Sequence, residues 1–242
     1  FHSDLHPHEW HGWHDFGNGS LGNMGTHVLD GVYWALKLEH PSAVEAEEIY
    51  GGADERYPLG GRVRWDFPAR QGQPPVKVYW YEGLTHGADP ALLSSMKAAP
   101  TEVQNLPPLL RELKKQYPEE EFDNSGTIYV GDKGIIYTGT YGGRMHVVPW
   151  AKMREISAPA KTLRRPGNIM DDFLNAVREG RTNTAAGFDY SARLTEFTLL
   201  GNVAQCVGAG ERLEWDGPAM RFKNRPDLNR WLDFPHRPGW AI

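Results

Sequence analysis

Six short segments rich in β-branched and aromatic residues limit the fold of this chain more than any other feature. Turn sequences such as Gly60-Gly61 and Gly131-Asp132 separate most of them. Links this short favour antiparallel pairing, because a parallel connection needs a crossover of a dozen or more residues. We therefore expect antiparallel strands over residues 43–50, 62–67, 76–81, 127–130, 134–138 and 145–148.

Three further segments carry apolar residues at helical spacing. The first covers residues 21–38, with Ser20 as a candidate N-cap and Pro41 as the stop. The others cover residues 169–178 and 191–207. The sequence thus predicts an α+β fold, with an open, predominantly antiparallel sheet and helices packed on one of its faces.

The length of 242 residues, 40% of them hydrophobic, is enough for one sizeable core, so we expect residues 1–242 to form a single domain. Residues 83–125 interrupt the strands with five prolines and are expected to form a surface insertion. Residues 226–242 include Trp231, Phe234 and Trp240 and are expected to dock on the body of the domain.

Charge and composition exclude several classes of partner. A formal net charge of -5 gives no broad basic surface for nucleic acid. Cys206 is the only cysteine, which excludes a disulfide or a thiolate metal cluster within one chain. No apolar run approaches the roughly 18 residues that span a bilayer. We therefore expect neither a nucleic-acid nor a membrane partner.

One face of the first predicted helix collects four side chains of different chemistry. Asn23 and His27 lie four residues apart, Asp30 follows three residues later, and Trp34 lies one turn further on. An amide, an imidazole, a carboxylate and an indole on one face are typical of a binding or catalytic site.

Packing offers an alternative explanation for this helix. Gly22 and Gly25 each lower helix stability by about 1 kcal/mol relative to alanine, and close approach by another backbone or by a ligand would explain them. In the alternative, the helix is buried against a sheet and His27 is a core histidine bonded to a backbone carbonyl.

A series of motifs extends this pattern along nearly the whole chain. They are Trp10, Trp13, Asp15-Phe16-Gly17, residues 22–30, Trp34-Ala35-Leu36, residues 130–134, residues 171–174, Phe188-Asp189-Tyr190, Glu196, residues 200–203 and Leu213-Glu214-Trp215. In this order they resemble the C-terminal domain of the Gfo/Idh/MocA family of oxidoreductases. The resemblance implies a carbohydrate or cyclitol substrate, held between this domain and an N-terminal Rossmann domain that binds NAD or NADP.

The resemblance also implies roles for the helix residues. The family's helix usually offers Asp and His four residues apart, at the hydroxyl whose carbon loses hydride; here those positions are Asn23 and His27. Because an amide cannot take up a proton, Asn23 would orient the hydroxyl and His27 becomes the candidate general base. Trp10 and Trp13 suit stacking on a pyranose ring, with packing over the helix as the alternative. The candidate substrate-binding residues are Trp10, Trp13, His14, Asp15 and Asp30.

A dinucleotide site is not expected within this chain. Gly17, Gly19 and Gly22 have the spacing G-x-G-x-x-G, but no apolar strand precedes them. That fingerprint has meaning only between a strand and a helix of a βαβ unit. NAD or NADP would then be supplied by a Rossmann domain that this sequence lacks.

The opening of the chain is rich in histidine. Imidazole and carboxylate groups suit zinc, manganese or iron, so His6, His8 and His11 are candidate ligands of a divalent metal. Their spacing matches no established metal motif, and a polar loop is the alternative.

Three functions follow from these observations. The first is the substrate-side domain of a carbohydrate or cyclitol oxidoreductase, forming a homo-oligomer through the open face of its sheet. The second is a stand-alone, NAD-independent carbohydrate hydrolase or lyase that uses a divalent metal. The third is a non-catalytic sugar-binding or assembly module.

Overall fold

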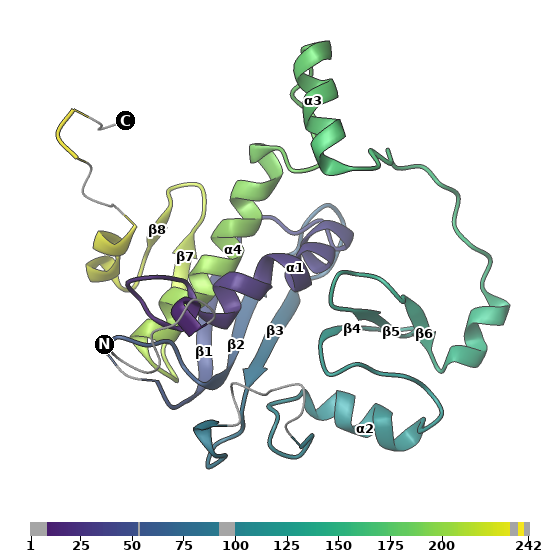
Figure 1. Ribbon diagram of the computed structural model, residues 1–242, viewed down its shortest axis with the longest axis horizontal. Coiled ribbons are helices and arrows are strands. Elements are labelled where there is room, and N and C mark those ends of the chain that lie inside the picture. Colours follow the sequence, from purple (N-terminus) through teal and green to yellow (C-terminus); the bar gives the residue numbers. More distant parts are fainter. Residues whose placement is uncertain (1–8, 53, 92–99, 233–236, 240–242) are drawn as a thin grey trace.

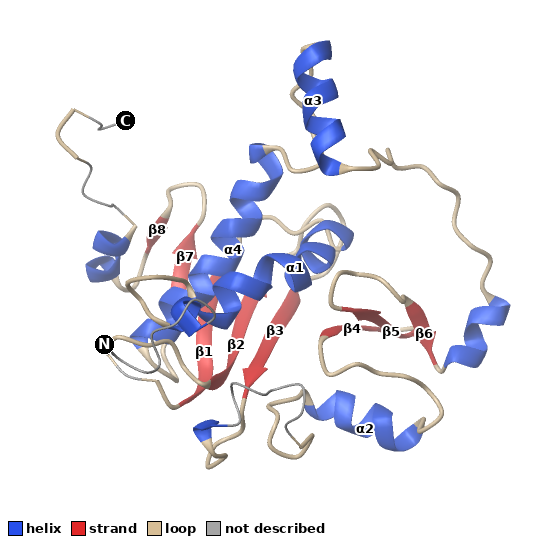
Figure 2. Ribbon diagram, viewed as in Figure 1, coloured by secondary structure: helices blue, strands red, loops and turns tan. Residues whose placement is uncertain are grey.

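Two antiparallel sheets and four α-helices make up the computed structural model, which describes residues 9–52, 54–91, 100–232 and 237–239 (Figures 1 and 2). The larger sheet has the strand order β3-β2-β1-β7-β8, and the smaller has the order β4-β5-β6. Helices α1 and α4 cover one face of the larger sheet. The predicted α+β fold with antiparallel strands is therefore confirmed, with the strands divided between two sheets.

Three strands of the larger sheet, β1 to β3, follow the predicted alternation closely, whereas β7 and β8 were not predicted. The strands of this sheet are β1 (Ala43–Tyr50), β2 (Gly60–Phe67), β3 (Val76–Gly83), β7 (Arg212–Asp216) and β8 (Arg221–Phe222). Val44 pairs with Trp65, and Trp65 pairs with Val78, so that buried side chains lie in register across three strands. Because side chains alternate between faces, Arg62 and Arg64 lie on the face away from the helices.

Helices α1 (Gly19–Ala35) and α4 (Phe188–Val207) pack on each other and on this sheet. The ring of Phe197 meets Trp65 at 4.9 Å and Phe67 at 5.2 Å between centroids. A Cβ added to Gly25 would lie 2.7 Å from Thr198 of α4. Close contact between the two helices therefore explains Gly25 without a ligand.

The smaller sheet has its own hydrophobic core. Its strands are β4 (Gly126–Gly131), β5 (Gly134–Gly139) and β6 (His146–Val148). Helix α2 (Pro108–Gln116) was not predicted; it lies within the expected insertion at 83–125 and packs Leu110 and Leu113 against Tyr137 and its neighbours. The described part of that segment thus contributes to a core. The Thr127 hydroxyl donates to the carbonyl of Val28, 3.4 Å away, which joins this sheet to α1.

The C-terminal segment docks in part, as expected. Residues Pro226–Trp231 form a 3-10 helix whose Leu228 is buried in the main core. The backbone N–H of Phe222 donates to the Asn229 side chain at 2.8 Å. Trp231 is exposed, whereas Phe234 and Trp240 lie outside the described residues.

Helix α3 (Ile169–Glu179) stands away from both sheets (Figure 1). The Asn168 side chain caps its start by accepting from the Met170 N–H at 2.8 Å, and Gly180 ends it with φ 64°. Both features match the usual preferences for helix ends. Its large apolar residues are exposed: Ile169, Met170, Phe173, Leu174 and Val177.

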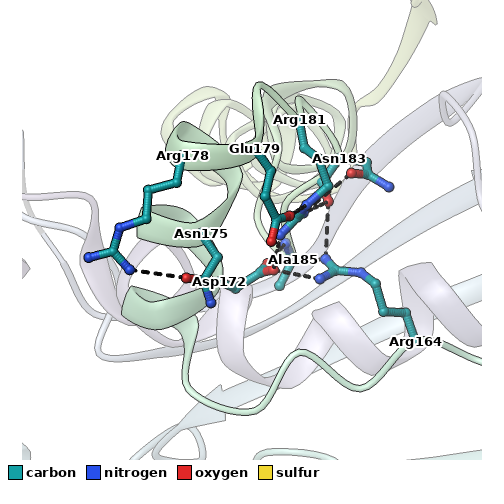
Figure 3. Close-up of polar contacts among 8 residues, drawn as sticks. All are labelled: Arg164, Asp172, Asn175, Arg178, Glu179, Arg181, Asn183 and Ala185. Carbon is teal, nitrogen blue, oxygen red and sulfur yellow. Dashed lines mark hydrogen bonds and ion pairs between the residues drawn. The ribbon is translucent and has the colours of Figure 1, made fainter.

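The other side of α3 is held by its own flanking segments (Figure 3). Asp172, only 3% exposed, accepts two bonds from Arg164, at 2.5 and 3.0 Å, and one from the Ala185 N–H at 2.8 Å. Arg181 approaches the same carboxylate at 3.4 Å. The bonds from Arg164 hold the pKa of Asp172 well below its usual range. This carboxylate therefore ties both flanking segments to α3.

Asp172→Asn is expected to loosen these segments, because the neutral amide loses the ion pair and two of its acceptor sites. Tryptic cleavage after Arg164 and Arg181 should become several-fold faster at pH 7. Since the folded pKa of Asp172 is depressed, the order of these segments in wild type, followed by NMR, should be present above pH about 4 and be lost as the pH falls through the depressed value. Asp171→Asn, at an exposed neighbouring position, is the control; equal cleavage of the two variants would contradict this role.

Candidate functional site

Asn23 and His27 lie on the exposed side of α1. The ring of His27 meets the edge of Tyr141 at 5.3 Å between centroids, with an interplanar angle of 74°. Tyr141 belongs to the turn between β5 and β6 and is itself 74% exposed. His27 is therefore not a buried core histidine. The Asn23 amide and the His27 imidazole are both open to a ligand.

Asp30 has a structural partner. The Tyr190 hydroxyl of α4 donates to its carboxylate, and this half-buried pair links the two helices. Burial, with Asp30 nearby, raises the pKa of Tyr190 far above its usual value, so the phenol remains protonated. Trp34, one turn beyond Asp30, is exposed. The predicted face thus presents Asn23, His27 and Trp34 to solvent, with Asp30 already bonded.

The loop before α1 carries the predicted aromatic residues. Its 3-10 helix, Glu9–Gly12, packs against α1. Trp10 is 44% exposed and lies 6.1 Å from the ring of Phe16. The guanidinium of Arg56 lies 4.8 Å from the centre of the Trp13 indole, which is a cation–π geometry. One face of the Trp13 ring is therefore covered by Arg56, whereas the Trp10 ring remains partly exposed.

The two polar residues beside Trp13 differ in their surroundings. The His14 ring meets the edge of Tyr57 at 4.4 Å, and its Nε2 lies 3.9 Å from the sulfur of Cys206. Loss of solvent around that sulfur raises the pKa of the Cys206 thiol, so it is not an activated nucleophile. Asp15 is exposed at the end of the loop.

The candidate metal ligands are only partly covered by the structure. His6 and His8 lie outside the described residues, and His11 is half-buried in the first 3-10 helix. Within the described parts of the chain, no three His, Cys, Asp or Glu side chains gather in a way that could hold a metal ion.

Glu82 is the polar residue of this region that sequence reasoning missed. Its carboxyl group accepts bonds from the Trp80 indole N–H at 2.8 Å and from the Gln205 amide at 2.5 Å. The hydroxyl of Ser20 also bonds to it. Ser20 is therefore not the helix cap predicted from the sequence, since α1 begins at Gly19 with Asn18 as its N-cap. Burial raises the pKa of Glu82.

A sequence signal for Glu82 does exist. Val78, Trp80 and Glu82 alternate along β3 and all point inward. A carboxyl group at an inward position of a strand must find bonding partners, because burial of an unbonded polar group is costly. Its presence therefore marks a polar joint inside the core, by which we mean the hydrogen-bonded group of Glu82, Trp80, Gln205 and Ser20.

The chain matches no protein-family model and no curated protein. The class of molecule that the fold defines is an α+β protein with helices on one face of an antiparallel sheet. No helix in the described residues is long and apolar enough to cross a membrane.

Proposed function

We propose that this chain is the substrate-side domain of a carbohydrate or cyclitol oxidoreductase of the Gfo/Idh/MocA type. The observation that carries the proposal is the exposed pair Asn23 and His27 on α1, with the His27 ring against Tyr141 and a loop with an open Trp10 ring before the helix. An amide, an imidazole and nearby aromatic rings are the groups that recognise sugar hydroxyls and the apolar faces of sugar rings.

In this proposal His27 takes the proton of the substrate hydroxyl while Asn23 holds that hydroxyl in place. A neutral imidazole can accept a proton near neutral pH, whereas the Asn23 amide can only donate or accept hydrogen bonds. The Trp10 ring would pack against the sugar. These three groups bind, orient and deprotonate the substrate.

The described residues do not fit a dinucleotide. Gly17, Gly19 and Gly22 follow a 3-10 helix rather than a strand, so they are not part of a βαβ unit. NAD or NADP, as the hydride acceptor, would be held by a separate Rossmann domain.

One uncovered apolar surface supports a partnership of this kind. Within the described residues, no other element covers the apolar side of α3, and a second domain would bury such a side. The outer face of the larger sheet carries ion pairs, such as Arg62 with Glu47 at 2.7 Å and Arg64 with Glu45 at 2.8 Å. We propose that a second copy of the chain packs on this outer face.

Saccharide binding by the full chain tests the proposal. Saturation-transfer NMR with a panel of hexoses and inositols should detect at least one ligand. His27→Ala and Asn23→Ala should each weaken its binding about tenfold, as expected for one or two lost hydrogen bonds. Glu112→Ala, at an exposed position of α2, should bind like wild type. Binding that is unchanged in both helix variants would exclude this face as the site.

A further inference from the structure

The carboxyl group of Glu82 joins four elements of the fold. Glu82 and Trp80 belong to β3, Gln205 comes from the last turns of α4, and Ser20 comes from the first turn of α1. His11, from the 3-10 helix in the aromatic loop, lies close enough to lower the pKa of this carboxyl. The side chain of Glu82 therefore bonds to the sheet and to both core helices, and the charge of His11 in the loop acts on it.

Neighbouring bonds extend the same joint. Asn202, one turn before Gln205 on α4, donates its amide to the carbonyl of Asn18 at 2.5 Å. It also bonds to the side chain of Tyr57, whose backbone N–H donates to the Gly12 carbonyl at 3.0 Å. The end of α4 thus holds the start of α1 and, through Tyr57, the loop.

A polar joint of this kind has a cost and an effect. Burying a carboxyl group is unfavourable unless its oxygens are bonded, and a leucine would fill the same space without that requirement. Buried hydrogen bonds favour one arrangement of their partners over others; the bonds to Glu82 and from the Asn202 amide have this effect, although the buried Oδ1 of Asn202 accepts no bond from the described residues. Glu82 therefore helps to fix the end of α4, whose Asn202 in turn holds the last residue of the loop, Asn18.

We infer that Glu82 is a positioning residue that holds the aromatic loop, residues 9–18, on the start of α1. It thereby fixes Trp10 and Trp13 relative to Asn23 and His27. The effect on saccharide binding rests on the proposed function; the effect on loop placement does not.

Hydrogen exchange of the full-length chain tests the placement directly. The His14 N–H is bonded to the Glu55 carbonyl at 3.0 Å and the Gly17 N–H to the Trp13 carbonyl at 2.9 Å, so both report on the loop. Glu82→Leu removes every acceptor of the joint and should speed their exchange at least about tenfold. Glu82→Gln keeps one carbonyl oxygen for Trp80, and the Gln205 amide can turn to accept from the new amide. Its loop should exchange about as slowly as that of wild type.

The pH profile provides a readout that a loss of packing would not change. Burial raises the pKa of Glu82, so its contribution is greatest when the group is neutral and falls as the pH rises through the raised value. After correction for intrinsic exchange, protection of the loop in wild type should therefore decrease with rising pH. Glu82→Gln should lack this decrease, and Glu112→Gln, at an exposed position, should retain it.

The outcomes separate the two proposals. If Glu82→Leu also loses protection in β2, the variant is globally unfolded, and the pH profiles of wild type and Glu82→Gln decide the question. Identical, flat profiles in these two proteins would overturn the positioning role. If the loop responds as expected but no saccharide binds to any variant, the positioning role stands and the proposed function fails. If saccharide binds, Glu82→Leu should weaken it and Glu82→Gln should not; equal affinity in all three would overturn the link to the site.

Discussion

Phe197→Ala is expected to lower the free energy of unfolding by about 3–5 kcal/mol. Phe197 lies at the centre of α4 with 0% of its surface exposed, and its ring contacts those of Trp65, Phe67 and Tyr33. Alanine would leave a cavity between the helix and the sheet that these large rings cannot close. Urea unfolding followed by circular dichroism should show a lower midpoint with little change in slope.

Phe188→Ala provides the matched control for this prediction. Phe188 starts the same helix but is 88% exposed, so its truncation should change stability by no more than about 0.5 kcal/mol. A loss below about 1 kcal/mol for Phe197→Ala would show that α4 is not packed on the sheet in this way.

Local patterns were sufficient to predict most elements of the fold. Alternating apolar residues define a strand wherever it pairs, which is why β1 and the two strands after it were predicted within two residues at either end. Strand β8 has only two residues and offers no period to detect. Helix α2 is not predicted because Pro107 and Pro108 fall in a proline-rich segment typical of a loop, although proline is favoured in the first turn of a helix.

The division into two sheets was beyond local patterns. Six of the eight strands were visible as segments, whereas β7 and β8 were not predicted, and the full strand order depends on contacts between residues far apart in the sequence. Strands β4, β5 and β6 pair only with one another and pack on Leu110, Leu113 and Phe122. Short links indicate that successive strands are neighbours, but nothing in the spacing indicates that β7 pairs with β1 or that β4 begins a separate sheet.

Contacts between residues far apart in the sequence also limited the prediction of the candidate site. Helical spacing placed Asn23 and His27 on one exposed face, because that relation is local. The groups that surround them were not predicted: Tyr141 comes from a turn of the smaller sheet, and Tyr190 bonds to Asp30 across 160 residues of sequence. Long-range partners such as these become visible only when the chain is folded.

Gly201→Val is the second substitution expected to have a large effect, a loss of about 3 kcal/mol. A Cβ at this position would lie 2.4 Å from the Trp65 ring and 2.5 Å from the Leu21 side chain, so valine cannot enter unless α4 moves away from both the sheet and α1. At an exposed helical position, replacing glycine by alanine stabilises by about 1 kcal/mol. Gly201→Ala should nevertheless destabilise, since the added carbon alone makes these contacts.

The direction of the stability change in Gly201→Ala tests this prediction directly. Gly143 has open space around it, and Gly143→Ala should leave the unfolding midpoint unchanged. A stabilised Gly201→Ala would mean that α4 lies further from Trp65 than the structure shows. Because Leu21 belongs to the first turn of α1, a shift of α4 at Gly201 would also displace the helix that carries Asn23 and His27. Gly201→Val should therefore impair saccharide binding at this face even at temperatures where the variant remains folded.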